Sequence, residues 1–170
     1  VGLPITLSIV FLELAERVGL HARGISFPGH FLVAVSDGNG DIIVDAFDGG
    51  VSLARSMFLE RLLERAESET SIESLESALA PASKADILLR QLRNLKGVYI
   101  ELGEVEKTLN VANHMLTIDP DLLPELLERA ALYNSLGYSR GAAEDYERAL
   151  TQIPAGEVHA EILDRLGSAK

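Results

Sequence analysis

Apolar residues recur at helical spacing along residues 3–18, which predicts an α-helix at the start of the chain. Ile5, Ile9 and Leu12 add apolar side chains on the other side of this helix, so we expect its first half to be buried all round. Pro4 suits the first helical turn, and Gly19 is well placed as the left-handed residue after the last turn. The stripe itself consists of Leu3, Leu7, Val10, Phe11, Leu14 and Val18.

Strand-like segments follow the predicted helix. Residues 22–27, 31–36 and 41–47 are rich in apolar and β-branched side chains. The last two are separated by Asp-Gly-Asn-Gly at residues 37–40, a strong turn signal. The pattern therefore predicts an antiparallel hairpin beside the helix, and an α+β unit over residues 1–51.

The turn also predicts which residues of the hairpin oppose one another. If it is centred on residues 38 and 39, Leu32 faces Asp45 and His30 faces Phe47. His30 and Asp45 are then diagonal neighbours on one face, with Cα atoms roughly 7–8 Å apart, a distance that their side chains can bridge. The spacing alone therefore predicts a His–Asp pair.

Such a pair has two interpretations. An Asp that orients a His is the arrangement that activates a nucleophile in covalent catalysis. Alternatively, His30 is a buried histidine that needs a hydrogen-bond partner at a strand end, and Asp45 caps the turn over residues 47–50. For a pair with no nucleophile beside it, the structural interpretation is the simpler one.

The middle of the chain is predicted to be a helical linker over residues 52–82. Apolar residues at helical spacing favour a helix over residues 53–65, and Thr70-Ser71-Ile72-Glu73 has the form of a capping box before a short helix. The Ser- and Glu-rich residues 67–77 are interpreted as a solvated linker. Ser83-Lys84-Ala85-Asp86 then predicts the start of a longer helix.

A repeat of 34 residues, the length of a tetratricopeptide (TPR) repeat, occupies the rest of the chain. The second copy has small and aromatic residues at its helix contacts, whereas the first has Lys96 where the second has Ala130. Repeat one is therefore degenerate. The recurring positions are Leu92, Tyr99, Leu102, Gly103, Leu116 and Pro120, and then Leu126, Tyr133, Leu136, Gly137, Leu150 and Pro154.

Residues 83–170 are predicted to contain two repeats and a closing amphipathic helix over residues 157–166. A freestanding array of such repeats needs about three. We therefore expect these helices to pack on the α+β unit or on the helices of residues 52–80, and not to fold alone. The apolar face expected to dock is that of Ile87, Leu88, Leu92 and Leu95.

Composition narrows the function. The net charge of −11 argues against nucleic acid or an anionic membrane as a partner, because the long-range field repels phosphate. The chain has no cysteine, which excludes disulfides and thiolate metal sites, and no cofactor is expected.

His21, His114 and His159 are interpreted as loop, surface or packing residues. No apolar run is long enough for a bilayer, and cytoplasmic residence is the default.

The segments at residues 2–7, 27–32 and 44–50 carry a resemblance to a known family. With the helix that ends at Gly19, they resemble the SirB family, bacterial proteins with a transglutaminase-like domain and a TPR tail. In active transglutaminase-like proteins a catalytic Cys precedes a Gly-Ile-Pro-Ala-Arg type of segment, which the residues from Gly19 to Arg23 resemble, by about fifteen residues. That position is Pro4 here. The resemblance implies His30 and Asp45 as the remnant of the catalytic site, and a nucleophile that is missing.

Three functions remain open at this point. The first is a non-catalytic interaction or regulatory protein with a protein or peptide partner. The second is a hydrolase or acyltransferase that uses His30 and Asp45 with the hydroxyl of Thr6 or Ser8, or with a nucleophile outside these residues. The third is a structural subunit whose α+β unit completes the helical array. Because the sequence begins at Val1 within an apolar pattern, we also expect the α+β unit to be truncated at its N-terminus.

Overall fold

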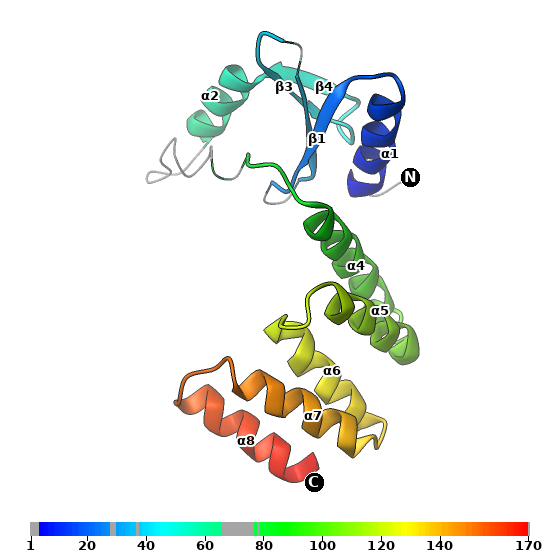
Figure 1. Ribbon diagram of the computed structural model, residues 1–170, viewed down its shortest axis with the longest axis vertical. Coiled ribbons are helices and arrows are strands. Elements are labelled where there is room, and N and C mark those ends of the chain that lie inside the picture. The colour runs from blue at the N-terminus through cyan, green and yellow to red at the C-terminus, as the bar shows by residue number, and fades with distance from the viewer. Residues whose placement is uncertain (1–3, 28–29, 37, 66–76, 78, 170) are drawn as a thin grey trace. The chain divides into compact units, whose positions relative to one another are not determined.

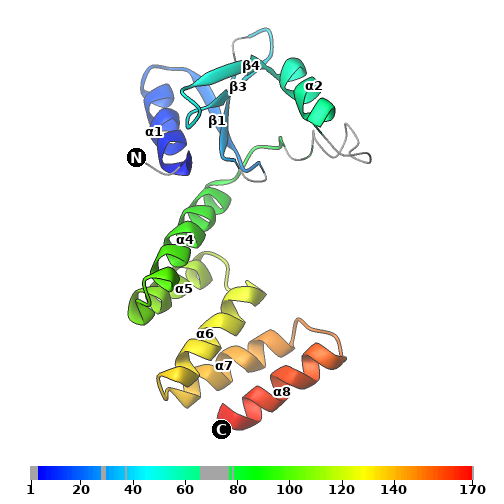
Figure 2. The same ribbon diagram turned by 180° about the vertical axis from the view of Figure 1, so that it is seen from behind.

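The computed structural model describes residues 4–27, 30–36, 38–65, 77 and 79–169 (Figures 1 and 2). The chain divides into two compact units, Val1–Gln91 and Leu92–Lys170. The first is an α+β unit and the second is helical, as the sequence predicts. The capping box predicted at residues 70–73 lies outside the described residues.

The first unit is built on a four-stranded antiparallel sheet in the order β1-β2-β3-β4. The β2–β3 hairpin pairs Val33 with Val44 and Ser36 with Asp41, which confirms the predicted register. The elements are α1 (Pro4–Arg17), β1 (His21–Ile25), β2 (Leu32–Ser36), β3 (Asp41–Asp45), β4 (Val51–Ala54) and α2 (Arg55–Arg65).

Strand β4 corrects the sequence analysis, which ended the α+β unit at residue 51 and placed residues 52–54 in the helical linker. The strand pairs with β3, from Asp45 opposite Val51 to Ile42 opposite Ala54. A strand of four residues is too short to show a period of its own. The free edge of β3 supplies the hydrogen-bonding partners that decide its conformation.

Helices α1 and α2 lie on opposite sides of the sheet (Figures 1 and 2). On the α2 side, Phe58 and Leu59 pack against a buried cluster whose members come from three strands and the segment after α2. Helix α1 packs against β1 and β2 on the other side. The buried cluster consists of Ile25, Leu32, Ala34, Ile43 and Leu79.

Helix α1 is buried on one side only, so the expectation that its first half is buried all round was wrong. Ile5 and Ala15 are buried against the sheet. The opposite apolar side is exposed, from 39% at Leu7 to 56% at Leu14. Among the described residues, the first unit offers a single sheet for α1 to pack against, which covers one face of a helix and no more. Gly19, two residues after the end of the helix, has φ of 77°, the left-handed conformation predicted for it.

The second unit consists of helices that pair through short turns. The helices of the repeat region are α4 (Lys84–Glu101), which contributes to both units, α5 (Val105–Ile118), α6 (Leu123–Ser135), α7 (Ser139–Leu150) and α8 (Glu157–Ala169). Gly103 and Gly137 adopt the same left-handed conformation after α4 and α6, with φ of 68° and 73°. This recurrence confirms the repeat predicted from the sequence.

The start of α4 is capped as predicted, but its buried face is not the one expected. Ser83 Oγ accepts a hydrogen bond from the Asp86 backbone N–H (3.1 Å), and Asp86 Oδ2 accepts one from the Ser83 N–H (2.9 Å). Leu88 and Leu95 are exposed, while Leu89 is buried. Apolar residues surround this helix, so its sequence period leaves open which of them face inward.

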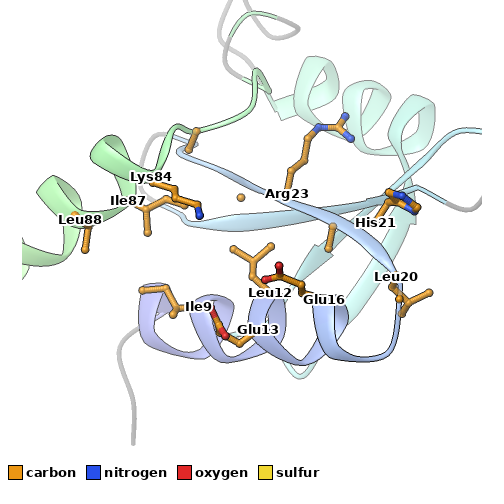
Figure 3. A pocket seen from close by; sticks show the side chains of 14 residues that line it. Ile9, Leu12, Glu13, Glu16, Leu20, His21, Arg23, Lys84, Ile87 and Leu88 are labelled. Atoms are coloured by element: carbon orange, nitrogen blue, oxygen red, sulfur yellow. The ribbon is translucent and has the colours of Figure 1, made fainter.

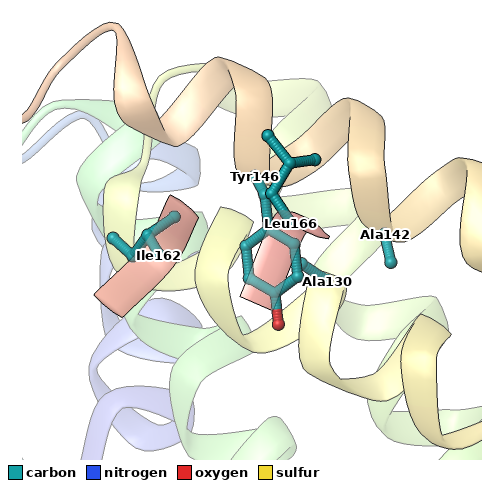
Figure 4. Close-up of a cluster of buried hydrophobic side chains, with 5 residues drawn as sticks. All are labelled: Ala130, Ala142, Tyr146, Ile162 and Leu166. Carbon is teal, nitrogen blue, oxygen red and sulfur yellow. The ribbon is translucent and has the colours of Figure 1, made fainter. Parts of the chain in front are cut away.

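Tyr146 is the largest buried side chain of the second unit, and its ring packs among residues of α6, α7 and α8 (Figure 4). Ala130 and Ala142 are fully buried beside it. Their small side chains leave room for the ring between the helices. Ile162 and Leu166 of α8 complete the cluster, so the closing helix is part of the core of this unit.

Lys96 occupies a buried position in α4, and a pair of carboxylates from α6 neutralises it. Its Nζ donates to Glu125 Oε2 at 2.5 Å and to Glu128 Oε2 at 2.6 Å. Glu125 is itself buried. Burial by itself lowers the pKa of Lys96, but the hydrogen bonds to the two carboxylates outweigh it and hold that pKa above its ordinary value. The residue that makes repeat one degenerate therefore joins it to repeat two.

We expect Ile162→Ala to lower the free energy of unfolding by about 2–5 kcal/mol, because it leaves a cavity in the Tyr146 cluster. Leu163→Ala on the same helix removes a side chain that is 48% exposed and should cost about 0.5 kcal/mol or less. Chemical denaturation followed by circular dichroism measures both. Equal costs for the two variants would contradict the packing of α8 described here.

Lys96→Met should cost about 3–5 kcal/mol, because it leaves the buried Glu125 carboxylate without its partner. Adding Glu125→Leu should restore most of that stability, because the double variant removes the uncompensated charge as well. The same denaturation experiment checks both variants. A single variant as stable as the parent chain would show that Glu125 is solvated.

Candidate functional site

His30 and Asp45 are in contact. His30 Nδ1 lies 3.2 Å from Asp45 Oδ2, at the end of the sheet where β3 stops. With its proton on Nδ1, His30 donates to Asp45, and Nε2 is left as the nitrogen that can accept a proton from a nucleophile. This is the relation of base to orienting carboxylate that thiol and serine catalysis uses. The predicted proximity of the pair is confirmed.

The pair is more exposed than the sequence analysis expected. The His30 side chain is 57% exposed and the Asp45 side chain 19%. The expectation of a largely buried pair was therefore wrong for His30. Strand β2 begins at Leu32, so His30 precedes the strand and lies outside the part of the chain that the sheet buries. A side-chain contact at this exposure contributes little to stability.

Asp45 also organises the turn that follows β3. Its Oδ1 accepts hydrogen bonds from the backbone N–H groups of Phe47 (2.9 Å) and Asp48 (3.2 Å). A side-chain oxygen that accepts from the backbone two and three residues later is a common way to hold a tight turn. Oδ1 thus serves the turn and Oδ2 faces His30. Asp45 has a complete structural role without any nucleophile.

The hydroxyl groups of α1 are poorly placed to act as a nucleophile. Ser8 is fully buried, and its Oγ donates to the Phe31 carbonyl at 3.0 Å, which ties α1 to β2. Alternation along β3 places Asp45 on the same face as Ile43, which packs with α2. Helix α1 lies on the other side (Figures 1 and 2). The exposed Thr6 belongs to this helix as well.

A second charged cluster joins β1 to β3, and the sequence analysis missed it. Arg23 Nη1 donates to Asp41 Oδ1 at 3.1 Å, Nη2 bonds to Oδ2, and Ser36 Oγ donates to Oδ1 at 2.9 Å. The hydrogen bonds from Arg23 lower the pKa of Asp41. Arg23 and Asp41 lie on strands separated by β2, so no local spacing in the sequence signals the pair. The pair joins β1 to β3 at the end of β3 opposite Asp45.

The remaining histidines are placed as expected. His21 and His114 are exposed. The Nδ1 atom of His159 lies 3.1 Å from the Ile153 carbonyl oxygen, which places this side chain against the turn between α7 and α8.

Two family models match the chain. The model of the transglutaminase-like superfamily matches residues 1–93, and a tetratricopeptide repeat model matches residues 95–167. The first match covers more than half of the chain and includes α1, the sheet, His30 and Asp45. The chain belongs to the transglutaminase-like superfamily. The expected combination of this domain with TPR helices is thereby confirmed.

The relatives are bacterial proteins named UPF0162. A UPF0162 protein of Xylella fastidiosa (strain Temecula1) is 35% identical over 159 residues, and one of Pseudomonas aeruginosa is 32% identical over 152 residues. These alignments cover 91% and 88% of this chain but 55% and 53% of the relatives. The chain therefore spans about half the length of the curated relatives it matches. None of the helices among the described residues is long and apolar enough to cross a membrane.

Asp45→Ala should lower the free energy of unfolding by about 1–3 kcal/mol, because the turn loses the acceptor of two backbone hydrogen bonds. Asp45→Asn keeps a side-chain oxygen for the turn and should cost less. His30→Ala should cost under about 1 kcal/mol, because its ring is exposed. Chemical denaturation of the three variants checks this order. A larger loss for His30→Ala than for Asp45→Ala would show that the pair, and not the turn, holds this end of the sheet.

Proposed function

We propose that this chain is a non-catalytic interaction or regulatory protein of the SirB type, a transglutaminase-like domain that has lost its nucleophile and is joined to TPR helices. The observation that carries the proposal is the double use of Asp45, which holds both the turn after β3 and His30. The pair is accounted for structurally. The family's thiol position corresponds to Pro4, and none of the 170 residues is a cysteine.

The exposed surface of the helical unit favours a protein as the partner of this chain. Large apolar side chains are exposed at the turns that end α4 and α6: Leu102 is 67% exposed and Leu136, its counterpart one repeat later, is 52% exposed. Tyr138 is also 53% exposed beside the second turn. Exposed apolar side chains that recur at corresponding places in two repeats support a protein-binding function. Together with the net charge of −11, these side chains favour a protein over a nucleic acid as the partner. We further propose that this chain resides in the cytoplasm.

We expect the chain to show no transamidase or peptidase activity, because loss of the nucleophile of a covalent mechanism costs several orders of magnitude in rate. Incorporation of a fluorescent amine into a glutamine peptide measures the first activity, and cleavage of a fluorogenic peptide the second. The parent chain and His30→Ala should both remain at the buffer rate. An active transglutaminase assayed in parallel is the positive control. A rate above background that His30→Ala abolishes would overturn the proposal.

One observation favours a second candidate, a hydrolase or acyltransferase whose nucleophile is a hydroxyl or comes from outside this chain. The His30 ring is 57% exposed, and the contact of its Nδ1 with Asp45 leaves Nε2 available. A fluorophosphonate probe labels activated hydroxyl nucleophiles. Labelling of Thr6 or Ser8 that requires His30 would establish the hydroxyl form of this candidate. Labelling that is equal in the parent chain and in His30→Ala would reject that form.

A further inference from the structure

A groove of about 780 Å³ lies between α1, β1 and the start of α4 (Figure 3). All of its residues belong to the first unit. Ile9 and Leu12 of α1 line one wall, and Ile87 and Leu88 of α4 line the other. The backbone of β1 runs along the floor (Figure 3). The groove lies apart from the His30–Asp45 pair, because neither of those residues lines it.

Strand β1 is an edge strand of the sheet, so among the described residues no strand pairs with the other side of its backbone. At its C-terminal end the chain itself supplies a partner. The Ala82 N–H donates to the Gly24 carbonyl oxygen at 2.9 Å, and Ile25 forms an antiparallel bridge with Pro81. This edge already accepts an added extended segment. The addition stops at Gly24.

The next outward-facing residue of β1 is Ala22. Along an antiparallel strand, residues that bond to the neighbour alternate with residues whose N–H and C=O groups point away from it. Because Gly24 bonds outward to Ala82, Ala22 also points outward. Its position in the groove makes these backbone groups accessible to a peptide. They are the next points of attachment for an added strand.

The charges along the groove indicate which peptide fits. Glu13 and Glu16 of α1 are exposed on one wall, while Lys84 lies at the α4 end (Figure 3). Arg23 points away from α1 in Figure 3 and is paired with Asp41 on the other face. In the part of the chain that the structure describes, no ion pair involves Glu13 or Glu16. The wall beside Ala22 is therefore acidic.

We propose that this groove binds an extended peptide of a partner protein by β-strand addition to β1. The peptide hydrogen-bonds to Ala22, places alternate apolar side chains between Leu12 and Ile87, and directs a Lys or Arg side chain to Glu13 and Glu16. This inference rests on the proposed interaction function and names the site and the class of ligand. Main-chain hydrogen bonds supply affinity in such complexes, and the pockets beside them supply selectivity.

The decisive variant is Ala22→Pro. Proline lacks the N–H that the peptide needs, yet an edge strand tolerates proline where that N–H points outward. The ladder between β1 and β2 should therefore survive, which ¹⁵N–¹H NMR spectra of the full chain verify. Ala22→Ser is the matched control, because it keeps the N–H with a side chain of similar size. The double variant Glu13→Lys with Glu16→Lys tests the charge independently of β1.

The probe is a library of random twelve-residue peptides displayed on phage and selected on the immobilised chain. We expect the selected peptides to combine alternating apolar residues with Lys or Arg. As synthetic peptides they should bind Ala22→Pro and the charge variant at least about tenfold more weakly than the parent, and Ala22→Ser within about twofold. In NMR titrations the amide signals of β1 should shift most.

Four outcomes would overturn the inference. Selection of no peptide is one, and equal affinity for the parent chain and a folded Ala22→Pro is another. The third is self-association of the parent chain in sedimentation experiments that Ala22→Pro abolishes, which would assign the edge to a second copy. Peptides whose binding shifts signals of α6 and α7 instead of β1 would refute the groove and leave the proposed function standing. The activity assays decide that function separately.

Discussion

The pairing of Ser36 with Asp41 fixes the first unit, because it sets the register of the hairpin on which the other elements depend. A shift by one residue would turn every side chain of β3 to the other face. In the observed register Asp41 meets Arg23 across β2, Ile43 packs toward α2, and Asp45 lies beside His30. One tight turn thus determines the Arg23–Asp41 pair, the core and the candidate site together.

In the second unit, a degenerate first repeat packs against a regular second repeat. An unpaired lysine at a buried helix contact would be costly, but Lys96 lies between two carboxylates of the next repeat. Arg129 makes a comparable bond within the second repeat, donating from Nε and Nη2 to Asp145 at 2.7 Å. Charge pairs thus join neighbouring helices of this unit. The small residues Ala130 and Ala142 let α6 and α7 pack closely at other contacts.

In our interpretation, the two faces of the sheet in the first unit and the edge of that sheet differ in what they contribute to packing and binding. The α2 side carries the buried cluster around Ile25, and the His30–Asp45 pair lies at the end of the sheet. On the α1 side, the edge of β1 runs beside an apolar groove with an acidic wall. One fold can carry different functions, so the same sheet can position a His–Asp pair at one end and a peptide at its edge.

Sequence period and turn chemistry alone determined much of this protein: the first helix, the hairpin register, the His30–Asp45 contact and the repeat of 34 residues. Each depends on residues close together in the chain or on an exact recurrence. Tertiary structure decided the rest. Strand β4 exists because β3 offers it a free edge, and α1 is exposed on one side because the sheet covers only the other. The groove along β1 combines α1 and α4, helices distant in sequence, so no local pattern could reveal it.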